Sequence, residues 1–555
     1  EPARRAAEND GVSSQCRPHA RRLHQGARAA APPRGRGRAW AWACVGVGVD
    51  VSRSITSFLA IPRACDRRGL VKVRTATTLS SDSVDRIVDG FATAFLGDPR
   101  RQQRLLDVSR RLATRPAVSV PAAMGSDAAV QGAYRLMNNR RVDFETLVTA
   151  QADATRERAE GAKDVLVLHD TTHASFPALD PAEIGYLNTG KPGFLIHVSL
   201  VVDAAGFRLP LGVAAAETLH REQPRRSARN VQGAETATWT DRESLRWHRG
   251  LLESGELLRN CRRVVHIADR ESDSYALMCV ALAASQRFIF RVRVDGRRGR
   301  ALHELLDGWS TVKQVTALCD GVLEREVALS TRNAKSAPEM NTAHPPRQGR
   351  LANLQFAATR IEIPRPPYLH DPTPATLQLN LVHVVEVEPP AGETPVEWLL
   401  YTTEAIDTPA QIAGVVDAYR TRWLIEEFNA ALKTGCIYEE REFESRDALR
   451  TMLALSLPIA SEILAIRGRA RTSPDNPVSE VLSNLRVELL RRLSSYKLPA
   501  AGVTVRDGLL AVAALGGHLK RNGAPGWKVL QRGMRELMAA EAGWLAAMAL
   551  RNHHL

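Results

Sequence analysis

Two apolar runs that each end at an aspartate constrain the fold of this chain most strongly. Residues 165–172 read VLVLHDTT, and residues 263–273 read RVVHIADRESD, so that Asp170 and Asp269 each close a mostly apolar stretch. Continuous apolar runs of this length are typical of strands buried on both faces of a sheet. We therefore expect both aspartates at the ends of central strands in a mixed α/β protein.

The sequence before these strands predicts helices over residues 82–160. Asp98 is placed to cap a helix that has Pro99 at its first position, and Pro116 closes the run. The helix is expected to bury one apolar stripe and to expose a basic face for DNA phosphates or, alternatively, only for solvent. The stripe consists of Leu105, Val108 and Leu112, and the basic face consists of Arg100, Arg104 and Arg111.

The later segments alternate between strand and helix patterns. Residues 194–212 read as two strands around a turn at 203–206, and residues 240–258 read as a helix. Short strand patterns separated by proline-rich loops fill residues 286–400, and helical patterns dominate from Pro409 onward. The chain should therefore contain one α/β core with helical regions at both ends.

The aspartates have a functional and a structural interpretation. Two carboxylates at strand ends and a third on a later helix are suited to hold Mg²⁺ beside a phosphodiester, because Mg²⁺ prefers a few hard oxygen ligands. Each aspartate alone could instead cap a helix or stabilise a turn. The candidate third carboxylate is Glu426, in the segment VVDAYRTRWLIEEFNAALKTG.

That segment also places cationic and aromatic groups beside Glu426. Tyr419, Arg422, Glu426 and Lys433 are spaced to lie along one face of a single helix. An Arg422–Glu426 pair could be an ordinary helix salt bridge. Cations next to a candidate metal ligand are also what binding of a cut DNA end requires.

These motifs resemble the DDE transposases of the insertion-sequence-four family, of the transposon Tn-five type. The family's Y-(2)-R-(3)-E-(6)-K signature is matched by Tyr419, Arg422, Glu426 and Lys433, and the segments HDTT and DRESD resemble its first two catalytic segments. The resemblance extends over most of the chain from about residue 82 to residue 545. It is poor over residues 470–510, and Asn429 and Ala430 stand where a basic DNA contact is expected in the family.

The resemblance implies an α/β fold with an RNase H-like catalytic core, a mixed sheet with flanking helices, interrupted by a β-rich insertion. A helical DNA-binding region would precede this core and a helical dimerisation region would follow it. The expected divisions are a basic low-complexity arm at 1–80, the DNA-binding domain at 81–160, the core at 161–285 and 398–470, the insertion at 286–397 and the dimerisation region at 471–555.

The resemblance also implies a reaction and its residues. Cut-and-paste transposition would proceed by metal-dependent nicking, hairpin formation and strand transfer at the transposon ends. Asp170, Asp269 and Glu426 would be catalytic and would bind two Mg²⁺ ions, for which Mn²⁺ could substitute. The DNA contacts would include Tyr419, Arg422 and Lys433, with Arg291 and Arg441 as further phosphate ligands and Trp398 either stacking on a flipped base or packing in the core.

The expected partners are double-stranded DNA, as terminal inverted repeats and as target, and a second copy of the chain. The chain carries 75 Lys and Arg against 61 Asp and Glu, and residues 1–80 alone hold 15 of the former and 5 of the latter. This arm is either disordered or a start-site artefact, with a start codon such as Val71 downstream. Two other functions stay open, namely a catalytically inactive DNA-binding remnant or transposition inhibitor, and a stand-alone nuclease.

Cysteine usage and hydropathy bear on localisation. The seven cysteines form no C-x-x-C pair, which favours a reducing cytoplasm. The resemblance implies that this is a bacterial cytoplasm and that the protein associates with the nucleoid. No run of eighteen apolar residues occurs in the sequence, so we expect no transmembrane helix and no membrane partner.

Overall fold

The computed structural model describes the chain from residue 83 to residue 553 with internal gaps. The described residues are 83–205, 208–223, 243–292, 298–302, 308–329, 345–367, 369, 373–519 and 525–553. They belong to the larger of two units, Ile61–Leu555, and the other unit is Glu1–Ala60. The basic arm expected at 1–80 lies outside the described residues.

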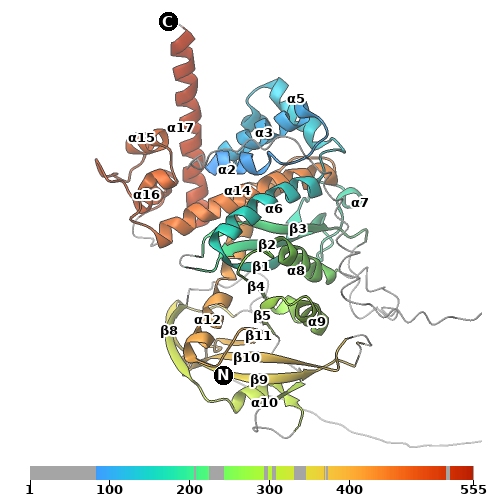
Figure 1. Cartoon of the computed structure of the whole chain (residues 1–555). Coiled ribbons are helices and arrows are strands. Elements are labelled where there is room, and N and C mark those ends of the chain that lie inside the picture. Colours follow the sequence, from blue (N-terminus) through green and yellow to red (C-terminus); the bar gives the residue numbers. More distant parts are fainter. Residues whose placement is uncertain are drawn as a thin grey trace, which may run out of the picture. The chain divides into compact units, whose positions relative to one another are not determined.

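One 11-stranded mixed sheet runs through the protein (Figure 1). The strand order is β3-β2-β1-β4-β5-β11-β10-β9-β6-β7, and β8 pairs with β9. β1 pairs antiparallel with β2 and parallel with β4, which in turn pairs parallel with β5. The first five strands are β1 (Asp164–Ser175), β2 (Gly193–Asp203), β3 (Pro210–Leu219), β4 (Arg263–Ala268) and β5 (Arg287–Arg291).

The expected strand around residues 165–172 is confirmed, but the expectation that it ends at Asp170 is wrong. β1 continues to Ser175 because its antiparallel pairing with β2 extends to Gly193. Its pairing with β4 stops earlier, at Leu168 and Ile267. The apolar run therefore ends where one neighbouring strand ends, and Asp170 lies inside β1 at this edge.

Helices flank the first strands. The two strands predicted in 194–212 and the helix predicted in 240–258 are confirmed, although β3 continues beyond residue 212 to Leu219. Residue 206 of the predicted turn lies outside the described residues. α13 and α14 cover one face of β2, and α8 lies against the other, where the Ser199 hydroxyl is 3.4 Å from the Gly250 carbonyl. The helices in this part of the sequence are α7 (Pro181–Ile184), α8 (Leu245–Leu257), η4 (Arg270–Ser272) and α9 (Tyr275–Ala283). The bounds of α13 and α14 are given below with the carboxy-terminal helices.

The amino-terminal region is helical, as predicted. The Asp98 side chain accepts a hydrogen bond from the Arg100 amide at 2.8 Å, and Pro99 begins α3. Leu105, Val108 and Leu112 are fully buried, which confirms the apolar stripe. The helices are α2 (Ser83–Gly90), α3 (Pro99–Thr114), α4 (Val120–Met124), α5 (Asp127–Met137) and α6 (Phe144–Ala162).

The strands of the predicted insertion extend the same sheet. β5 pairs antiparallel with β11, next to which β10 and β9 follow. The expected division of the chain at residues 286 and 398 stays a prediction; residue 286 directly precedes β5, and residue 398 lies within β11. The elements are β6 (Arg298–Ala301), β7 (Ser310–Thr311), α10 (Val312–Ala317), β8 (Leu323–Leu329), β9 (Arg350–Pro364), β10 (Thr376–Val387) and β11 (Glu397–Thr402).

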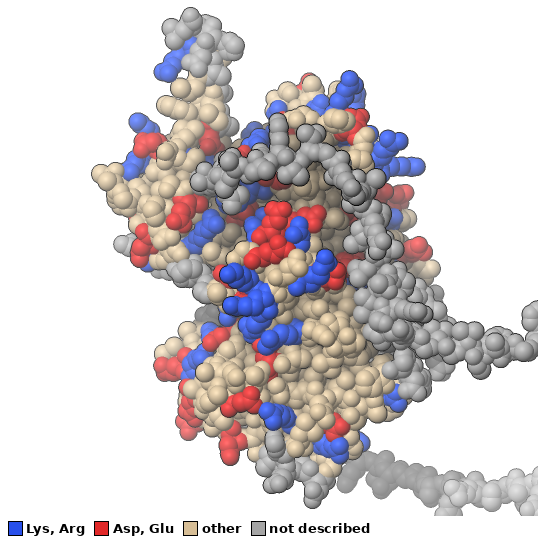
Figure 2. Space-filling view, in the orientation of Figure 1, with Lys and Arg blue, Asp and Glu red and all other residues tan. Residues whose placement is uncertain are grey.

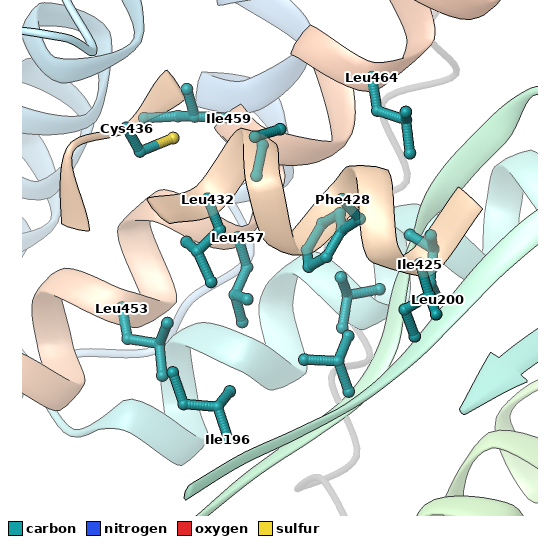
Figure 3. Close-up of a cluster of buried hydrophobic side chains, with 14 of the residues drawn as sticks. Ile196, Leu200, Ile425, Phe428, Leu432, Cys436, Leu453, Leu457, Ile459 and Leu464 are labelled. Atoms are coloured by element: carbon teal, nitrogen blue, oxygen red, sulfur yellow. The ribbon is translucent and has the colours of Figure 1, made fainter. Parts of the chain in front are cut away.

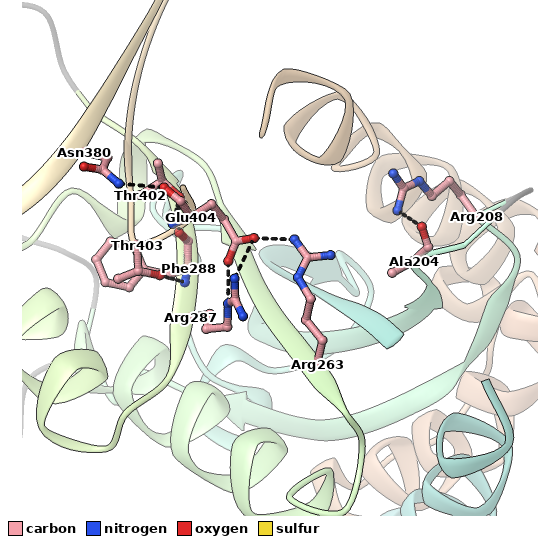
Figure 4. A network of polar contacts seen from close by, with 9 residues as sticks. All are labelled: Ala204, Arg208, Arg263, Arg287, Phe288, Asn380, Thr402, Thr403 and Glu404. Carbon is pink, nitrogen blue, oxygen red and sulfur yellow. Dashed lines mark hydrogen bonds and ion pairs between the residues drawn. The ribbon is translucent and has the colours of Figure 1, made fainter. Parts of the chain in front are cut away.

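A buried carboxylate joins the two groups of strands (Figure 4). Glu404, just after β11, pairs with Arg263 of β4 and with Arg287 of β5, the latter at 2.7 Å. The Asn380 amide of β10 donates to the Glu404 carbonyl at 2.6 Å. Because these contacts cross β4, β5, β11 and β10, the strands of the predicted insertion are anchored to the first five.

The carboxy-terminal region is helical, as expected from Pro409 onward. By length and composition, Arg446–Arg469 of α14 could cross a membrane, but 72% of its most apolar window is buried inside the protein, as in a core helix. The elements are α12 (Pro409–Arg420), α13 (Trp423–Ala430), η5 (Ala431–Gly435), η6 (Tyr438–Glu440), α14 (Arg446–Thr472), η7 (Val478–Glu480), α15 (Asn484–Leu493), α16 (Val505–Leu515) and α17 (Trp527–His553).

Candidate active site

The structure brings three carboxylates from distant parts of the sequence close enough for the charges of two of them to act on the third. Asp170 lies in β1, Asp269 follows β4 and Glu426 lies in α13. Burial raises the pKa of Asp170 to about 7, and the negative charges of Glu426 and Asp269 add to this rise. Like charges held this close disfavour full ionisation, so the cluster is suited to bind a cation.

Asn429 fixes the Asp170 carboxylate. Its Nδ2 donates to Asp170 Oδ2 at 3.1 Å, and its side chain is buried. Asn429 is three residues after Glu426 on α13, so both side chains lie on the helix face turned to β1. The sequence indicated only that a basic residue was absent here, and the i, i+3 spacing was the signal for this contact.

Asp269 fits the structural interpretation as well as the functional one. Its side chain accepts a hydrogen bond from the Glu271 amide at 2.9 Å and caps the short helix η4. The same carboxylate raises the pKa of Asp170. The turn after β4 therefore orients Asp269 toward the other acidic groups.

Arg422 pairs with one of these carboxylates. Its Nη2 lies 3.3 Å from Glu426 Oε1 and its side chain is mostly buried. Burial lowers the pKa of Arg422, but Tyr419, Asp269, Asp170 and Glu426 outweigh this effect and raise the pKa overall. Arg422 therefore offsets part of the negative charge of the cluster.

The expectation of one regular helix from Tyr419 to Lys433 is wrong. α12 ends at Arg420, and the Arg422 and Ile425 amides bond carbonyls three residues earlier, at 2.9 and 3.1 Å, which tightens the turn. A wider π turn follows at η5, where the Cys436 amide bonds the Ala431 carbonyl. Tight and wide turns break the predicted stacking along one face.

Lys433 pairs with a different carboxylate, that of Glu439. Its Nζ is 3.6 Å from Glu439 Oε1, and the same glutamate oxygen accepts from the Ser175 amide at the end of β1 at 3.0 Å. Burial, followed by the Lys433 charge, lowers the pKa of the neighbouring His173. Lys433 marks the far end of β1, while Tyr419 and Arg422 flank the acidic cluster.

The opposite face of α13 and η5 is apolar and sets the position of the acidic face (Figure 3). Ile425, Phe428 and Leu432 are fully buried. They belong to a cluster with Leu200 of β2 and with Leu457 of α14. Because this packing fixes the rotation of α13, Glu426 and Asn429 are directed at β1.

Trp398 lies at the margin of the hydrophobic core. Its side chain is partly buried, and its ring centroid is 5.5 Å from that of Tyr419 in an edge-on arrangement. Beside it, the Arg291 Nη2 donates to the Glu397 carbonyl at 3.2 Å, and burial lowers the Arg291 pKa. Partial exposure next to Tyr419 is compatible with base stacking and with core packing, and both interpretations stay open.

Arg441 does not occupy a position suited to a phosphate contact. It is buried, and its Nη atoms donate to the carbonyls of Val118, Pro116 and Cys436 at 2.6, 2.7 and 2.8 Å. These bonds join the loop after α3 to the segment after η5. Arg441 therefore holds the helical regions together.

The basic residues of α3 differ from one another. Arg100 and Arg104 are exposed, whereas Arg111 pairs with Asp107 at 3.0 Å and donates to the Met124 carbonyl at 2.6 Å. Figure 2 shows that basic and acidic side chains are interspersed over the face in view. Arg100 and Arg104 are thus the better placed of the three to contact phosphates.

Arg246 of α8 is a contact that the sequence did not predict. Its Nε donates to the hydroxyl of Thr171, the residue after Asp170, at 2.7 Å. Its Nη2 pairs at 3.1 Å with Glu271, two residues after Asp269. One arginine thus bridges the segments that carry the two aspartates, a long-range relationship with no local sequence signal.

The acidic cluster fits a hard divalent cation by its chemistry. Within the described ranges, no three His, Cys, Asp or Glu side chains are close enough to hold a metal ion as they stand. Asp170 is bonded to Asn429, and Glu426 is paired with Arg422. The donors are nonetheless all carboxylate oxygens, and their mutual repulsion is the condition that a dication such as Mg²⁺ relieves.

Part of the chain matches a known protein family. Residues 87–142 match the family described as transposase DNA-binding. The matched range runs from the second half of α2 to the residues before α6, and it includes Arg100, Arg104 and Arg111. The match supports a transposase with DNA as its partner.

Proposed function

We propose that this chain is a DDE-type cut-and-paste DNA transposase. The observation that carries the proposal is that Asp269 and Glu426, from two distant segments, add to the rise in the pKa of Asp170, while Asn429 of the Glu426 helix bonds the Asp170 carboxylate. The transposase DNA-binding match at residues 87–142 lies in the same chain. Its expected place of action is the nucleoid in the bacterial cytoplasm.

The sheet supports an RNase H-like core within this proposal. The strand order β3-β2-β1-β4-β5 combines an antiparallel β1-β2-β3 unit with parallel β1, β4 and β5. In this arrangement the first acidic residue lies on the central strand and the second at the end of its parallel neighbour. The third acidic residue, Glu426, comes from α13, which packs on the face of the sheet that carries the Asp170 side chain.

The chain's own residues would perform distinct parts of the reaction. Asp170, Asp269 and Glu426 would hold Mg²⁺, which supplies Lewis acidity for phosphodiester hydrolysis and transesterification. Arg422, which now pairs with Glu426, would donate to phosphate oxygens of the cleaved strand together with Tyr419. Arg100 and Arg104 would contact the backbone of the terminal repeats.

A homodimer is part of the same proposal. The carboxy-terminal half of α17 extends away from α15 and α16 (Figure 1). It exposes Trp544, Leu545 and Leu550, whose side chains retain about half or more of their accessible area. Apolar side chains on an extended helix support association with a second copy.

One observation favours a second candidate function, a catalytically inactive DNA-binding remnant. Asp170 bonds Asn429, and Glu426 pairs with Arg422. Among the described residues, no three His, Cys, Asp or Glu side chains are arranged to coordinate a metal ion. In that case the chain would bind transposon ends without cutting them. Asn429 and Arg422 would then stabilise the fold in place of a metal.

The experiment that tests the proposal follows the DNA products. Purified full-length protein is incubated with a labelled duplex that carries the inverted repeats flanking its gene, with Mg²⁺ or with EDTA. We expect nicks, hairpins and joined target DNA only with Mg²⁺. Hydrolysed breaks without joining would indicate a nuclease, and binding without cleavage would indicate the remnant.

A further inference from the structure

A chain of buried hydrogen bonds crosses the sheet on the face covered by α8. The Ser199 hydroxyl of β2 is 2.9 Å from Nδ1 of His169 on β1. Nε2 of His169 is 2.9 Å from Nδ1 of His266 on β4. Nε2 of His266 is 3.0 Å from Oε1 of Gln286, the residue before β5. Both histidines are almost completely buried.

The partners of Gln286 determine which group donates in each hydrogen bond of this series. Gln286 Nε2 donates to the Ala284 carbonyl at 3.2 Å, so that its Oε1 faces His266 as an acceptor. His266 therefore donates from Nε2 and accepts at Nδ1, and His169 donates to it from Nε2. Nδ1 of His169 then accepts the Ser199 hydroxyl hydrogen. Burial lowers the pKa of His266 to about 4, which keeps this ring neutral.

This series of hydrogen bonds lies where β1 and β4 stop pairing, next to Asp170 and Asp269. β1 and β4 last pair at Leu168 and Ile267, immediately before His169 and Ala268. Asp170 follows His169 directly and points to the opposite face, where Asn429 contacts it. The His169–His266 bond therefore joins the two strands beside the last backbone pair that precedes Asp170 and Asp269.

We propose that His169 and His266 are positioning residues for divalent cation binding. Their hydrogen bond holds β1 and β4 at a fixed spacing, and this spacing sets the separation of the carboxylates of Asp170 and Asp269. The inference rests on the proposed function, since it assigns these rings a role at the same acidic cluster. Neither ring touches DNA or the cation.

The test measures Mn²⁺ binding to full-length protein without DNA, by the loss of the free-ion electron paramagnetic resonance signal. We expect His266→Leu to weaken Mn²⁺ binding by about tenfold, the lower end of the effect of groups that support metal ligands. His266→Gln retains one donor and one acceptor and should bind within about twofold of wild type. Ser199→Ala, which removes only the end of the chain, should cause a smaller loss.

Control variants separate positioning from folding. His248→Leu removes a different buried histidine, which lies on α8 and takes no part in this series of hydrogen bonds, and it should leave Mn²⁺ affinity unchanged. In His266→Leu, the His169 ring stays buried without its ring partner, which costs stability. The double variant His169→Leu/His266→Leu removes both rings, so it should be more thermally stable than His266→Leu. It should still bind Mn²⁺ weakly.

Two results overturn the inference in distinguishable ways. Wild-type Mn²⁺ affinity in folded His266→Leu and in the double variant would show that the histidines only pack. A wild-type protein that binds no Mn²⁺, or whose binding is unaffected by Glu426→Gln, would overturn the proposed function and the inference with it.

Discussion

Asn429 donates a hydrogen bond to Asp170 at 3.1 Å and joins α13 to β1 across 259 residues of sequence. Asn429 is buried and Asp170 is partly buried, so the bond restricts the orientation of the carboxylate. We expect Asn429→Ala to slow DNA cleavage by about tenfold, because a misplaced ligand costs this much in comparable sites. The free energy of unfolding should fall by about 1 kcal/mol.

Cleavage rates and urea unfolding measure these two effects. Asn353→Ala is a suitable control, since its amide bonds Glu324 on an exposed surface of β9. An Asn429→Ala protein that cleaves DNA at the wild-type rate would contradict a role for this contact in orienting Asp170.

DNA binding through α3 should depend on salt. Arg100 and Arg104 are exposed, and each phosphate contact contributes about 0.9 to the slope of log affinity against log salt concentration. The double variant Arg100→Ala/Arg104→Ala should therefore lower the slope by about 1.8. Arg111→Ala should change it little, because Arg111 pairs with Asp107. Fluorescence anisotropy over a salt series measures the slopes, and equal slopes in wild type and double variant would count against these contacts.

Trp398 should matter most at hairpin formation. Its ring contacts Tyr419 and remains partly exposed, so it can stack on a base that leaves the duplex. We expect Trp398→Ala to slow hairpin formation more than the first nick, as measured by single-turnover kinetics. Trp309→Ala, at another exposed tryptophan, should affect neither step. Equal slowing of both steps by Trp398→Ala would favour the core-packing interpretation.

Stability should fall in mild acid because several histidines, His197 and His248 among them, are buried in the neutral form. Burial lowers the pKa of His197 to about 3 and of His248 to about 4, from an ordinary value of 6.5. The unfolded chain therefore binds protons below pH 6.5 that the folded chain does not bind. The stabilisation is complete above pH 6.5 and declines as the pH falls toward these lowered values.

Thermal unfolding between pH 7 and pH 5 measures this decline, which should be about 1 kcal/mol per pH unit for each histidine. His197→Gln should make the decline shallower. A melting temperature that is constant or rises toward pH 5 would contradict the expectation.

Local features of the fold were predictable from the sequence. Asp98 and Pro99 predicted the start of α3 because capping depends on neighbouring residues. The apolar residues before Asp170 predicted a buried strand because a central strand has no solvent-facing side. The extension of β1 to Ser175 was not predictable locally, since it depends on pairing with β2.

The errors at the site have the same origin. Lys433 was placed beside Arg422 by helical periodicity, which assumes regular turns, whereas the structure has a tight turn and a π turn between them. Arg441 was expected from the family resemblance to bind phosphate, but it bonds carbonyls of a segment more than 300 residues away. The absence of a basic residue at Asn429 was read correctly, but its contact with Asp170 was not predictable locally because the two residues are 259 positions apart.

The central claim is that Asp170, Asp269 and Glu426 act together in cleavage rather than in folding or DNA binding. The most direct measurement compares Asp170→Asn, Asp269→Asn and Glu426→Gln with wild type for Mg²⁺-dependent nicking of a transposon-end duplex and for affinity toward it. We predict loss of nicking in each variant, with affinity within about threefold of wild type because phosphate contacts dominate binding. Nicking retained by any one folded variant would contradict the account.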